Sequence, residues 1–235
     1  VARALWEAGC RSFFVARPKE GEELRGILSE ATIYVLDGLF PGQAEFYARL
    51  DLRPALISID EAREWAGFGR VYGRKLPCAL HVDTGINRLG FSLPEFAALL
   101  DEQFTLEGLN LTLLMSHLAC ADDPLHALNQ SQRDCFADLR RRLPGVPASL
   151  ANSSGIFLGK DYTHDLVRPG IALYGGNPTP GRQNPMLPVA HLEGAVMQVR
   201  QVRAGETVGY GATWQASRPT RIAIIGAGYK DGVPR

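Results

Sequence analysis

The stretch "CALHVDTGINRLGF" (Cys78–Phe91) decides the fold. Its first five residues are mostly apolar, and they predict a short strand that is buried on both faces. Asp83-Thr84-Gly85 follows this strand at once, and Arg88 comes three residues later. Asp-Thr-Gly is the signature of pepsin-like proteases, but it also suits the turn after a strand of a parallel α/β sheet. The remainder of the chain decides between these two interpretations.

Short apolar runs recur, and helical patterns separate them. The predicted strands are residues 12–16, 32–36, 55–59, 78–82, 111–116, 148–152 and 165–169. The predicted helices include residues 2–9, 20–30 and 124–143, and another follows Ser92, a residue type that favours the N-cap position. Repeated strand–helix units predict a parallel α/β protein. We expect a (β/α)8 TIM-type barrel that lacks its first strand, although periodicity alone also allows an open doubly wound sheet.

The pattern changes after the loop "GGNPTPGRQNPMLP" (175–188), which is rich in glycine and proline. Beyond it, apolar residues alternate and turns recur, without a helical pattern. We therefore expect residues 1–186 to form the barrel and residues 187–235 to begin a C-terminal β domain. The sequence starts without Met, inside a helical pattern, so we expect a chain truncated at both ends.

This organisation excludes the protease interpretation. Aspartic proteases are all-β proteins that bring two such motifs together, so that two carboxylates share a proton. Here the motif is not repeated, and it follows a strand of a predicted parallel array.

The amino-acid composition further limits the class of protein. Twenty-five basic residues balance 25 acidic ones, so the net charge of zero weighs against a nucleic-acid or membrane-surface protein. The four cysteines lack CxxC spacing, which is typical of reduced thiols in a cytoplasmic protein. The five histidines lack metal-ligand spacing, and no apolar run is long enough to span a membrane.

Polar residues follow four successive predicted strands. They are Asp83 to Arg88, then His117, then Asn152-Ser153-Ser154, and finally Arg168-Pro169-Gly170. Each group has an ordinary structural explanation: a turn, a structural histidine, a helix cap or a tight turn. In a parallel barrel, however, the carboxyl ends of the strands meet at one face, where the chemistry gathers. Their convergence therefore predicts a site.

The residue types indicate the chemistry of this site. The Ser153 hydroxyl and the N–H groups of Gly170 and Ile171 suit a phosphate group without any lysine. Arg88 and Arg168 are permanent cations, suited to a carboxylate, a phosphate or an aromatic nitrogen.

At these residues the chain resembles the alanine racemases. The segments that carry the resemblance, in family order, are "HVDTGINRLGF", "SHLACAD", "ANSSG", "VRPGIALYG", "VGYGATW" and "GYKDGVPR". The resemblance implies a barrel followed by a β domain, with pyridoxal 5'-phosphate as the cofactor. It also implies the interconversion of L-alanine and D-alanine by two-base proton transfer on a pyridoxal-phosphate imine, which supplies D-alanine for peptidoglycan in the cell wall. The family forms head-to-tail homodimers.

The resemblance also implies residue roles. Tyr210 would be one of the two bases, although a tyrosine with a pKa near 10 is a poor base at neutral pH. A link through His117 to Arg168 would lower that pKa, since nearby positive charge favours the phenolate. Arg168 would also donate to the pyridine nitrogen of the cofactor.

Arg88 would contact the phenolic oxygen of the cofactor and orient the substrate carboxylate. Tyr229 matches a tyrosine at the substrate entrance, and in the dimer Tyr210 and Tyr229 would act in trans. The remaining cofactor-binding positions implied by the resemblance are Asn152, Ser153, Gly170 and Ile171.

Two departures from the family pattern stand out. The second base of the family is the Schiff-base lysine of a Lys-x-x-x-Tyr-Gly motif, and no lysine of this sequence sits in such a motif. We therefore expect the chain as given to be inactive or nearly so. His81 stands where many family members have a lysine. It could hydrogen-bond Arg88 when neutral, or simply line the barrel.

Three alternatives remain open at this point. A broad-specificity amino-acid racemase or a basic amino-acid decarboxylase would use the same cofactor, and tests with L-alanine and L-lysine separate them. A non-catalytic pyridoxal-phosphate-binding barrel protein would need no β segment after residue 188. The chain could also be no more than a structural fragment.

Overall fold

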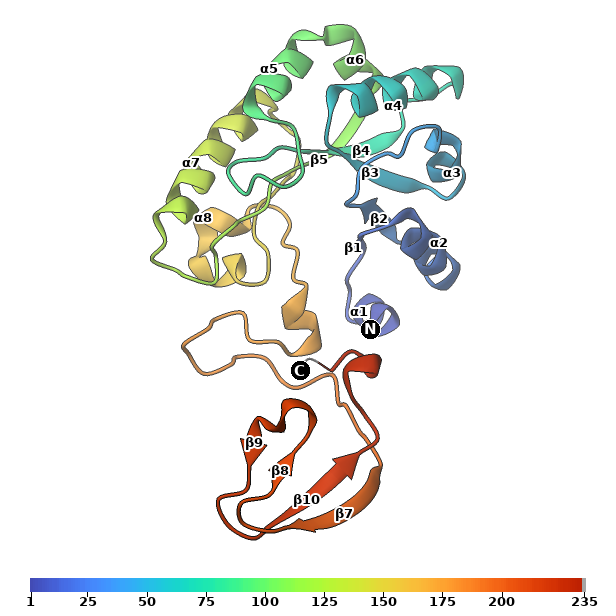
Figure 1. The fold of residues 1–235 in the computed structure, drawn as a ribbon. Helices are drawn as coiled ribbons and strands as arrows, with labels where there is room; N and C mark the ends of the chain where they lie inside the picture. Colours follow the sequence, from blue (N-terminus) through green and yellow to red (C-terminus); the bar gives the residue numbers. More distant parts are fainter. Residues whose placement is uncertain (234–235) are drawn as a thin grey trace. The chain divides into compact units, whose positions relative to one another are not determined.

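The computed structural model describes residues 1–233, and the chain divides into two compact units (Figure 1). The first is Val1–Leu187 and the second is Pro188–Arg235.

The first unit is built on a parallel sheet whose six strands lie in sequence order. They are β1 (Ser12–Val15), β2 (Thr32–Val35), β3 (Leu52–Leu56), β4 (Pro77–His81), β5 (Asn110–Met115) and β6 (Ala148–Ser149). Parallel neighbours in sequence order, with helices between them, are the arrangement of a (β/α) barrel wall. The expected parallel α/β architecture is confirmed.

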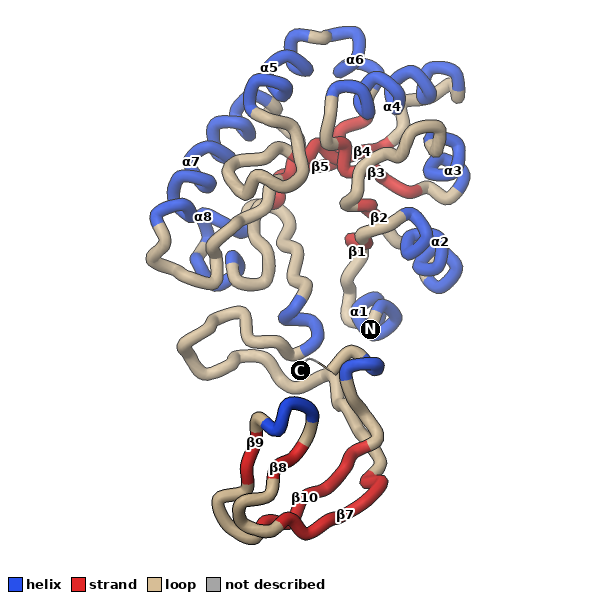
Figure 2. The backbone as a smooth tube through the Cα atoms, in the orientation of Figure 1, coloured by secondary structure: helices blue, strands red, loops and turns tan. Residues whose placement is uncertain are grey.

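Helices line one side of this curved sheet (Figure 2). They are α1 (Ala2–Glu7), α2 (Pro18–Ile27), α3 (Ala44–Arg49), α4 (Ile59–Val71), α5 (Leu93–Asp101), α6 (Gln103–Gly108), α7 (Ala127–Arg142) and α8 (Lys160–Thr163), with the 3-10 turns η1 (Gly155–Leu158) and η2 (Ile171–Tyr174). Ser92 caps α5 as expected, because its hydroxyl accepts from Glu95 N and the Glu95 carboxylate accepts from Ser92 N.

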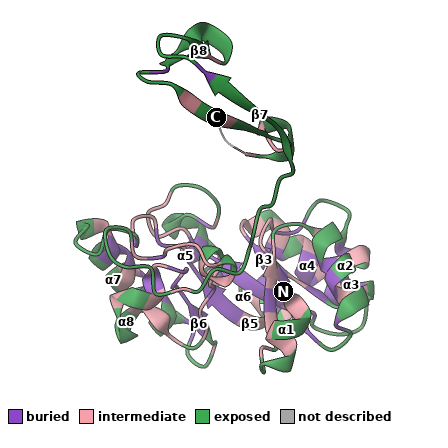
Figure 3. Cartoon of the chain, turned by 90° about the horizontal axis from the view of Figure 1, so that it is seen from below, coloured by how far each residue is buried: buried purple, intermediate pink, exposed green. Residues whose placement is uncertain are grey.

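Side chains of each strand alternate between two apolar layers. In β4, Cys78 and Leu80 join the large core between sheet and helices, whereas Ala79 joins a smaller cluster with Tyr34 and Met115. This smaller cluster lies on the other face of the sheet, the barrel interior. In Figure 3 the strands of this unit are largely buried, while the helices carry exposed residues. Burial on both faces explains why the strands read as continuous apolar runs.

The structure corrects three predicted strands. The third is Leu52–Leu56 rather than residues 55–59, because Ser58 caps α4 and ends the extended segment. The sixth is limited to Ala148–Ser149. Residues 165–169 form no strand, only a bridge between Asn152 and Arg168.

The backbone explains the loss of this last strand. The N–H groups of Asp165 and Leu166 both donate to the Ala148 carbonyl, so regular pairing cannot develop. Pro169 has no N–H group with which to continue the ladder.

The second unit is a β structure. Strand β7 (Val196–Val202) pairs antiparallel with β10 (Thr220–Ile225), and β8 (Thr207–Val208) pairs with β9 (Trp214–Gln215). The 3-10 turns η3 (Tyr210–Ala212) and η4 (Tyr229–Asp231) are its helical segments within the described residues. Across residues 1–233, no helix is both long and apolar enough to cross a membrane.

A half-buried carboxylate, that of Glu61, joins two strand ends of the first unit. Glu61 Oε2 accepts from Leu39 N and from Ile57 N, each at 3.1 Å, so it joins the loops after β2 and β3. Burial raises the pKa of Glu61, and these N–H groups only partly offset that effect.

Substitutions at Glu61 test this tie. Because the pKa of Glu61 is raised, the folded chain binds a proton there more tightly than the unfolded chain does. Protonated Glu61 therefore stabilises the fold at low pH, and this stabilisation is lost as the pH rises through the pKa of the folded state. We expect Glu61→Gln to be at least as stable as the wild type at pH 7, with a smaller difference at pH 5. Glu61→Ala leaves two N–H groups without an acceptor and should lower the free energy of unfolding by about 1–3 kcal/mol. Urea denaturation measures both.

The matched control is Glu64→Ala, because Glu64 Oε1 accepts from Gly42 N of the same loop in a solvent-exposed hydrogen bond. Equal losses for Glu61→Ala and Glu64→Ala would contradict the role of the Glu61 carboxylate in joining the two loops.

Candidate active site

The loop after β4 is organised by the Asp83 carboxylate. Its Oδ1 accepts from Gly85 N (2.7 Å) and Ile86 N (2.9 Å), and its Oδ2 accepts from Arg88 N (3.1 Å). Burial alone would raise the pKa of Asp83, but hydrogen bonds from backbone N–H groups outweigh it and lower that pKa. Asp83 is therefore an ionised loop anchor, which is the turn interpretation of the Asp-Thr-Gly motif.

The same loop returns to the strand from which it left. Asp83 N donates to Phe91 O and Phe91 N donates to His81 O, which closes the loop at its base. Gly90 makes this possible: its φ is +120°, and a Cβ atom there would lie 2.8 Å from both Asp83 N and His81 O. The Arg88 side chain, at the exposed tip, has no hydrogen-bond or ion-pair partner among residues 1–233.

Gln132, a buried residue of α7, connects two strand ends. Its Nε2 donates to Thr84 Oγ1 (3.2 Å) and to His117 O (2.9 Å), and its Oε1 accepts from Ala119 N (2.9 Å). Sequence reasoning did not single out Gln132. The helical spacing does place Gln132 on the same face as Phe136 and Leu139, where a polar residue is unusual. The structure shows that its amide is fully buried on that face.

Arg168 places a buried guanidinium beyond β6. It donates to Ser149 Oγ and to Ser116 O, with a longer contact to Leu150 O at 3.5 Å. All three acceptors are uncharged. Burial lowers the pKa of Arg168 to about 10, so the guanidinium still carries its charge at neutral pH.

Two histidines near Arg168 are held in the neutral form. Burial, followed by the positive charges of Arg168 and Arg88, lowers the pKa of His117 to about 4. Burial also lowers the pKa of His81 to about 4, and the charge of Arg168 adds to that effect. Neither nitrogen of His81 has a hydrogen-bond partner in the part of the chain that the structure describes. No side-chain hydrogen bond joins His117 to Arg168 within the described residues, since the guanidinium donates to Ser149 and Ser116 instead.

The turn at Ser153 concentrates N–H donors around one hydroxyl. Ser153 is buried, and its Oγ accepts from Gly170 N (2.8 Å) and Ala172 N (3.3 Å) at the start of η2. The Asn152 side chain supports the start of η1, because its Oδ1 accepts from Gly155 N (2.9 Å). A hydroxyl and successive N–H groups, including that of Ile171 between them, are a donor set that fits an anion.

The structure thus gathers the polar residues that follow the strands of the first unit at the carboxyl ends of those strands. We call this group the strand-end site; it comprises His81, Asp83–Arg88, His117, Asn152, Ser153 and Arg168–Ile171. Within residues 1–233 no cluster of three or more potential metal ligands occurs.

Tyr210 and Tyr229 belong to the second unit. Tyr210 is 92% exposed and lies between Gly209 (φ +82°) and Gly211 (φ +74°), which occupy the left-handed region. Tyr229 begins η4 and is also exposed.

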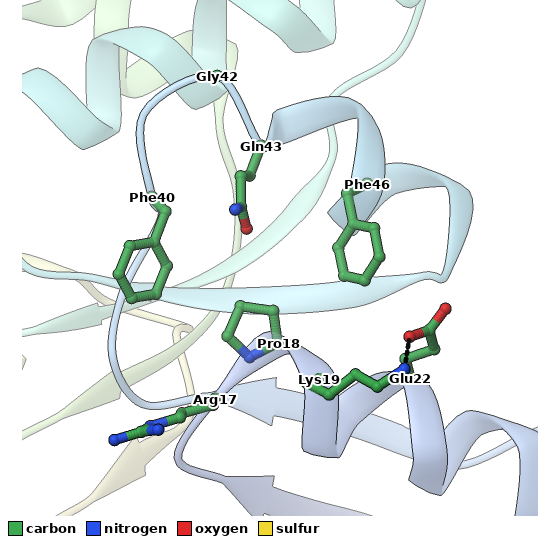
Figure 4. A pocket seen from close by; sticks show the side chains of 8 residues that line it. All are labelled: Arg17, Pro18, Lys19, Glu22, Phe40, Gly42, Gln43 and Phe46. Carbon is green, nitrogen blue, oxygen red and sulfur yellow. Dashed lines mark hydrogen bonds and ion pairs between the residues drawn. The ribbon is translucent and has the colours of Figure 1, made fainter.

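A separate hollow of about 480 Å³ lies between the start of α2 and the loop that leads into α3 (Figure 4). Phe40, Phe46 and Pro18 provide its apolar wall, and Lys19 and Glu22 form an ion pair at 2.7 Å beside it. It contains none of the predicted site residues, and no motif in the sequence indicated it.

Comparison with known proteins places this geometry in a family. The family model described as "Alanine racemase, N-terminal domain" matches residues 1–178. The model described as "Alanine racemase, C-terminal domain" matches residues 189–235. The chain belongs to the alanine racemase family.

Individual relatives agree with this assignment. The alanine racemase of Methylobacterium nodulans is 54% identical over 235 residues, which are 100% of this chain and 63% of that protein. A catabolic alanine racemase of Agrobacterium fabrum is 47% identical and is covered to 61%. The chain therefore spans less than two thirds of the length of these relatives.

Solved structures show the same fold. The crystal structure of alanine racemase from Bartonella henselae, with covalently bound pyridoxal phosphate, has a TM-score of 0.88 and 37% identity. It covers 100% of this chain, and the chain covers 66% of it. This likeness confirms the expected fold class, a TIM-type barrel followed by a β domain.

The buried His81 gives a testable dependence of stability on pH. Its pKa is about 4 in the folded chain, against about 6.5 when unfolded. Between pH 4 and pH 6.5 the unfolded chain binds more protons at His81 than the folded chain does. The contribution of His81 to stability is therefore present above pH 6.5 and is lost as the pH falls to 4. We expect His81→Met to reduce the loss of unfolding free energy between pH 7 and pH 4 by up to about 3 kcal/mol.

Urea denaturation at a series of pH values measures this slope. His191→Met, at an exposed position of the second unit, is the matched control for removing one imidazole. A slope in His81→Met equal to that of the wild type would show that His81 is not held in the neutral form.

Proposed function

We propose that the whole protein to which this chain belongs is a pyridoxal-phosphate-dependent isomerase that interconverts L-alanine and D-alanine. The observation that carries the proposal is the charged guanidinium of Arg168, which is buried without a carboxylate partner among residues 1–233 and near two neutral histidines of the strand-end site. The sequence identity of 54% to an alanine racemase supports the same activity. We propose residues 1–186 as the barrel domain and residues 187–235 as part of the β domain.

The donor set around Ser153 fits the phosphate of this cofactor. The hydroxyl, with the N–H groups of Gly170, Ile171 and Ala172, would hold the phosphate without a cationic side chain. Asn152 would keep this turn in shape, since its side chain already bonds to Gly155 N and Leu118 O. When bound, pyridoxal phosphate withdraws electrons from the α-carbon of the amino acid and acidifies its C–H bond.

Arg168 would donate to the pyridine nitrogen of the cofactor. Because its pKa stays near 10, the guanidinium donates a hydrogen bond there and keeps its own proton. The electron-withdrawing strength of the ring would therefore stay moderate, which suits racemisation better than reactions that need a long-lived carbanion.

Tyr210 would remove or return the α-proton on one face of the substrate. The positive field of Arg168, with His117 between the two, would favour the phenolate and lower the pKa that a tyrosine normally has. The second base is the family's Schiff-base lysine. Arg88, whose guanidinium has no ion-pair partner among residues 1–233 and lies at an exposed loop tip, would bind the substrate carboxylate.

Tyr210 and Tyr229 would act on the strand-end site of a second subunit, in a head-to-tail homodimer. Tyr229 would stand at the substrate entrance of that subunit. We place the protein in the cytoplasm, where D-alanine would supply peptidoglycan for the cell wall. Rescue of D-alanine auxotrophy tests this role against a catabolic one, which is the role in the name of the Agrobacterium fabrum relative.

Replacing Tyr210 tests the proton-transfer role. Tyr210→Phe removes a general acid–base group, so we expect racemisation of L-alanine in the whole protein to fall by about 10²–10⁴-fold. The assay is formation of D-alanine with saturating pyridoxal phosphate. Tyr72→Phe, at a half-exposed tyrosine at the end of α4, is the matched control. Retention of most activity by Tyr210→Phe would remove Tyr210 from the mechanism.

The same assay with L-lysine addresses substrate range. Racemisation of L-lysine at a comparable rate would favour a broad-specificity racemase, and release of CO₂ would favour a decarboxylase.

A further inference from the structure

Phe14 and Arg168 meet across the barrel interior. Strand β1, which carries Phe14, is at one edge of the sheet, and Arg168 bridges to Asn152 beyond β6, at the other edge. Nevertheless Arg168 Cζ lies over the Phe14 ring, 5.9 Å from its centroid. This contact therefore joins two ends of the sheet that share no backbone pairing.

The Phe14 ring is itself fixed by Tyr34. The two rings stack with centroids 5.0 Å apart and planes inclined by 14°. Tyr34 OH donates to Thr112 Oγ1 at 2.9 Å, and that hydroxyl donates to Cys78 O at 2.9 Å. The Arg53 guanidinium lies 5.6 Å from the Tyr34 centroid and contacts its hydroxyl at 3.4 Å. The stack is therefore anchored on β2, β4 and β5 before it reaches Arg168.

The Arg168 segment needs such a contact. Residues 165–169 form a single bridge rather than a strand, so the sheet does not fix the direction of the side chain. Its hydrogen-bond acceptors are all uncharged and lie at the carboxyl ends of β5 and β6. An aromatic face attracts a cation and also favours a guanidinium lying parallel to it, and the attraction grows when water is excluded.

We propose that Phe14 is a positioning residue that holds the Arg168 guanidinium at the strand-end site, and that Tyr34 holds Phe14 in place for this task. The functional consequence rests on the proposed function, in which Arg168 faces the cofactor ring.

The experiment compares two substitutions in one strand. Phe14→Leu removes the aromatic face that Arg168 contacts, whereas Phe13→Leu makes the same change at the adjacent residue, which packs in the core between sheet and helices. NMR of the apo protein follows hydrogen exchange at the Arg168 guanidinium. Absorption titration with pyridoxal phosphate gives the dissociation constant of the cofactor.

We expect Phe14→Leu to speed guanidinium exchange and to weaken cofactor binding, each by about fivefold. Phe13→Leu should change neither by more than about twofold, and Phe14→Tyr should restore both, because it keeps the ring. If Phe14→Leu and Phe13→Leu have the same effect on guanidinium exchange, Phe14 only fills space and the proposal is overturned.

A third variant separates this proposal from the proposed function. If Arg168→Lys leaves cofactor binding unchanged, Arg168 does not face the cofactor, and the proposed function loses its main support. The guanidinium exchange measured in the Phe14 variants still decides whether the ring positions the arginine. If Arg168→Lys weakens binding and Phe14→Leu does not, the positioning role alone fails.

Discussion

The strand-end site depends on one constraint, a guanidinium that is buried without a carboxylate partner among the described residues. Arg168 must satisfy its donors with neutral oxygens, and Ser149 and Ser116 provide them from neighbouring strands. Its uncompensated charge, added to burial, keeps His81 and His117 neutral. A carboxylate partner would neutralise this field and engage the donors. The absence of such a partner within residues 1–233 therefore leaves a cation that can act on a bound molecule.

The polar residues around this charge form two groups. One group hydrogen-bonds to the backbone and fixes its shape, and the other keeps donors for a ligand. Asp83 uses both carboxylate oxygens on N–H groups of its own loop, and Gln132 connects two strand ends to α7. Arg88 has no partner within the described chain, and the Ser153 hydroxyl binds only N–H groups. The first pair gives the site its shape, and the second pair has donors that remain available to a ligand.

The sequence predicted what depends on local pattern. Apolar runs located most of the strands, Ser92 located a helix start, and the polar strand ends indicated the residues that we propose as the site. It could not predict that residues 165–169 fail to form a strand, since this depends on two N–H groups that share the Ala148 carbonyl. Nor could it identify Glu61, Ser149 or Phe14. Their roles follow from which face of an element they occupy and what lies across the interior, and a pattern along the chain does not contain that information.

The turn at Ser153 has a consequence for how an anion enters and leaves. Because the serine oxygen accepts from Gly170 N and Ala172 N, these two N–H groups have an acceptor within the protein itself. An anion that binds to these N–H groups must displace the Ser153 oxygen from them. Association is therefore an exchange of one acceptor oxygen for another. The internal hydrogen bonds lower the free energy of the protein before an anion binds. The net free energy gained on binding is smaller by the same amount. Such a turn is held in shape by its own hydrogen bonds and would release a bound anion more readily than an open ring of N–H groups would.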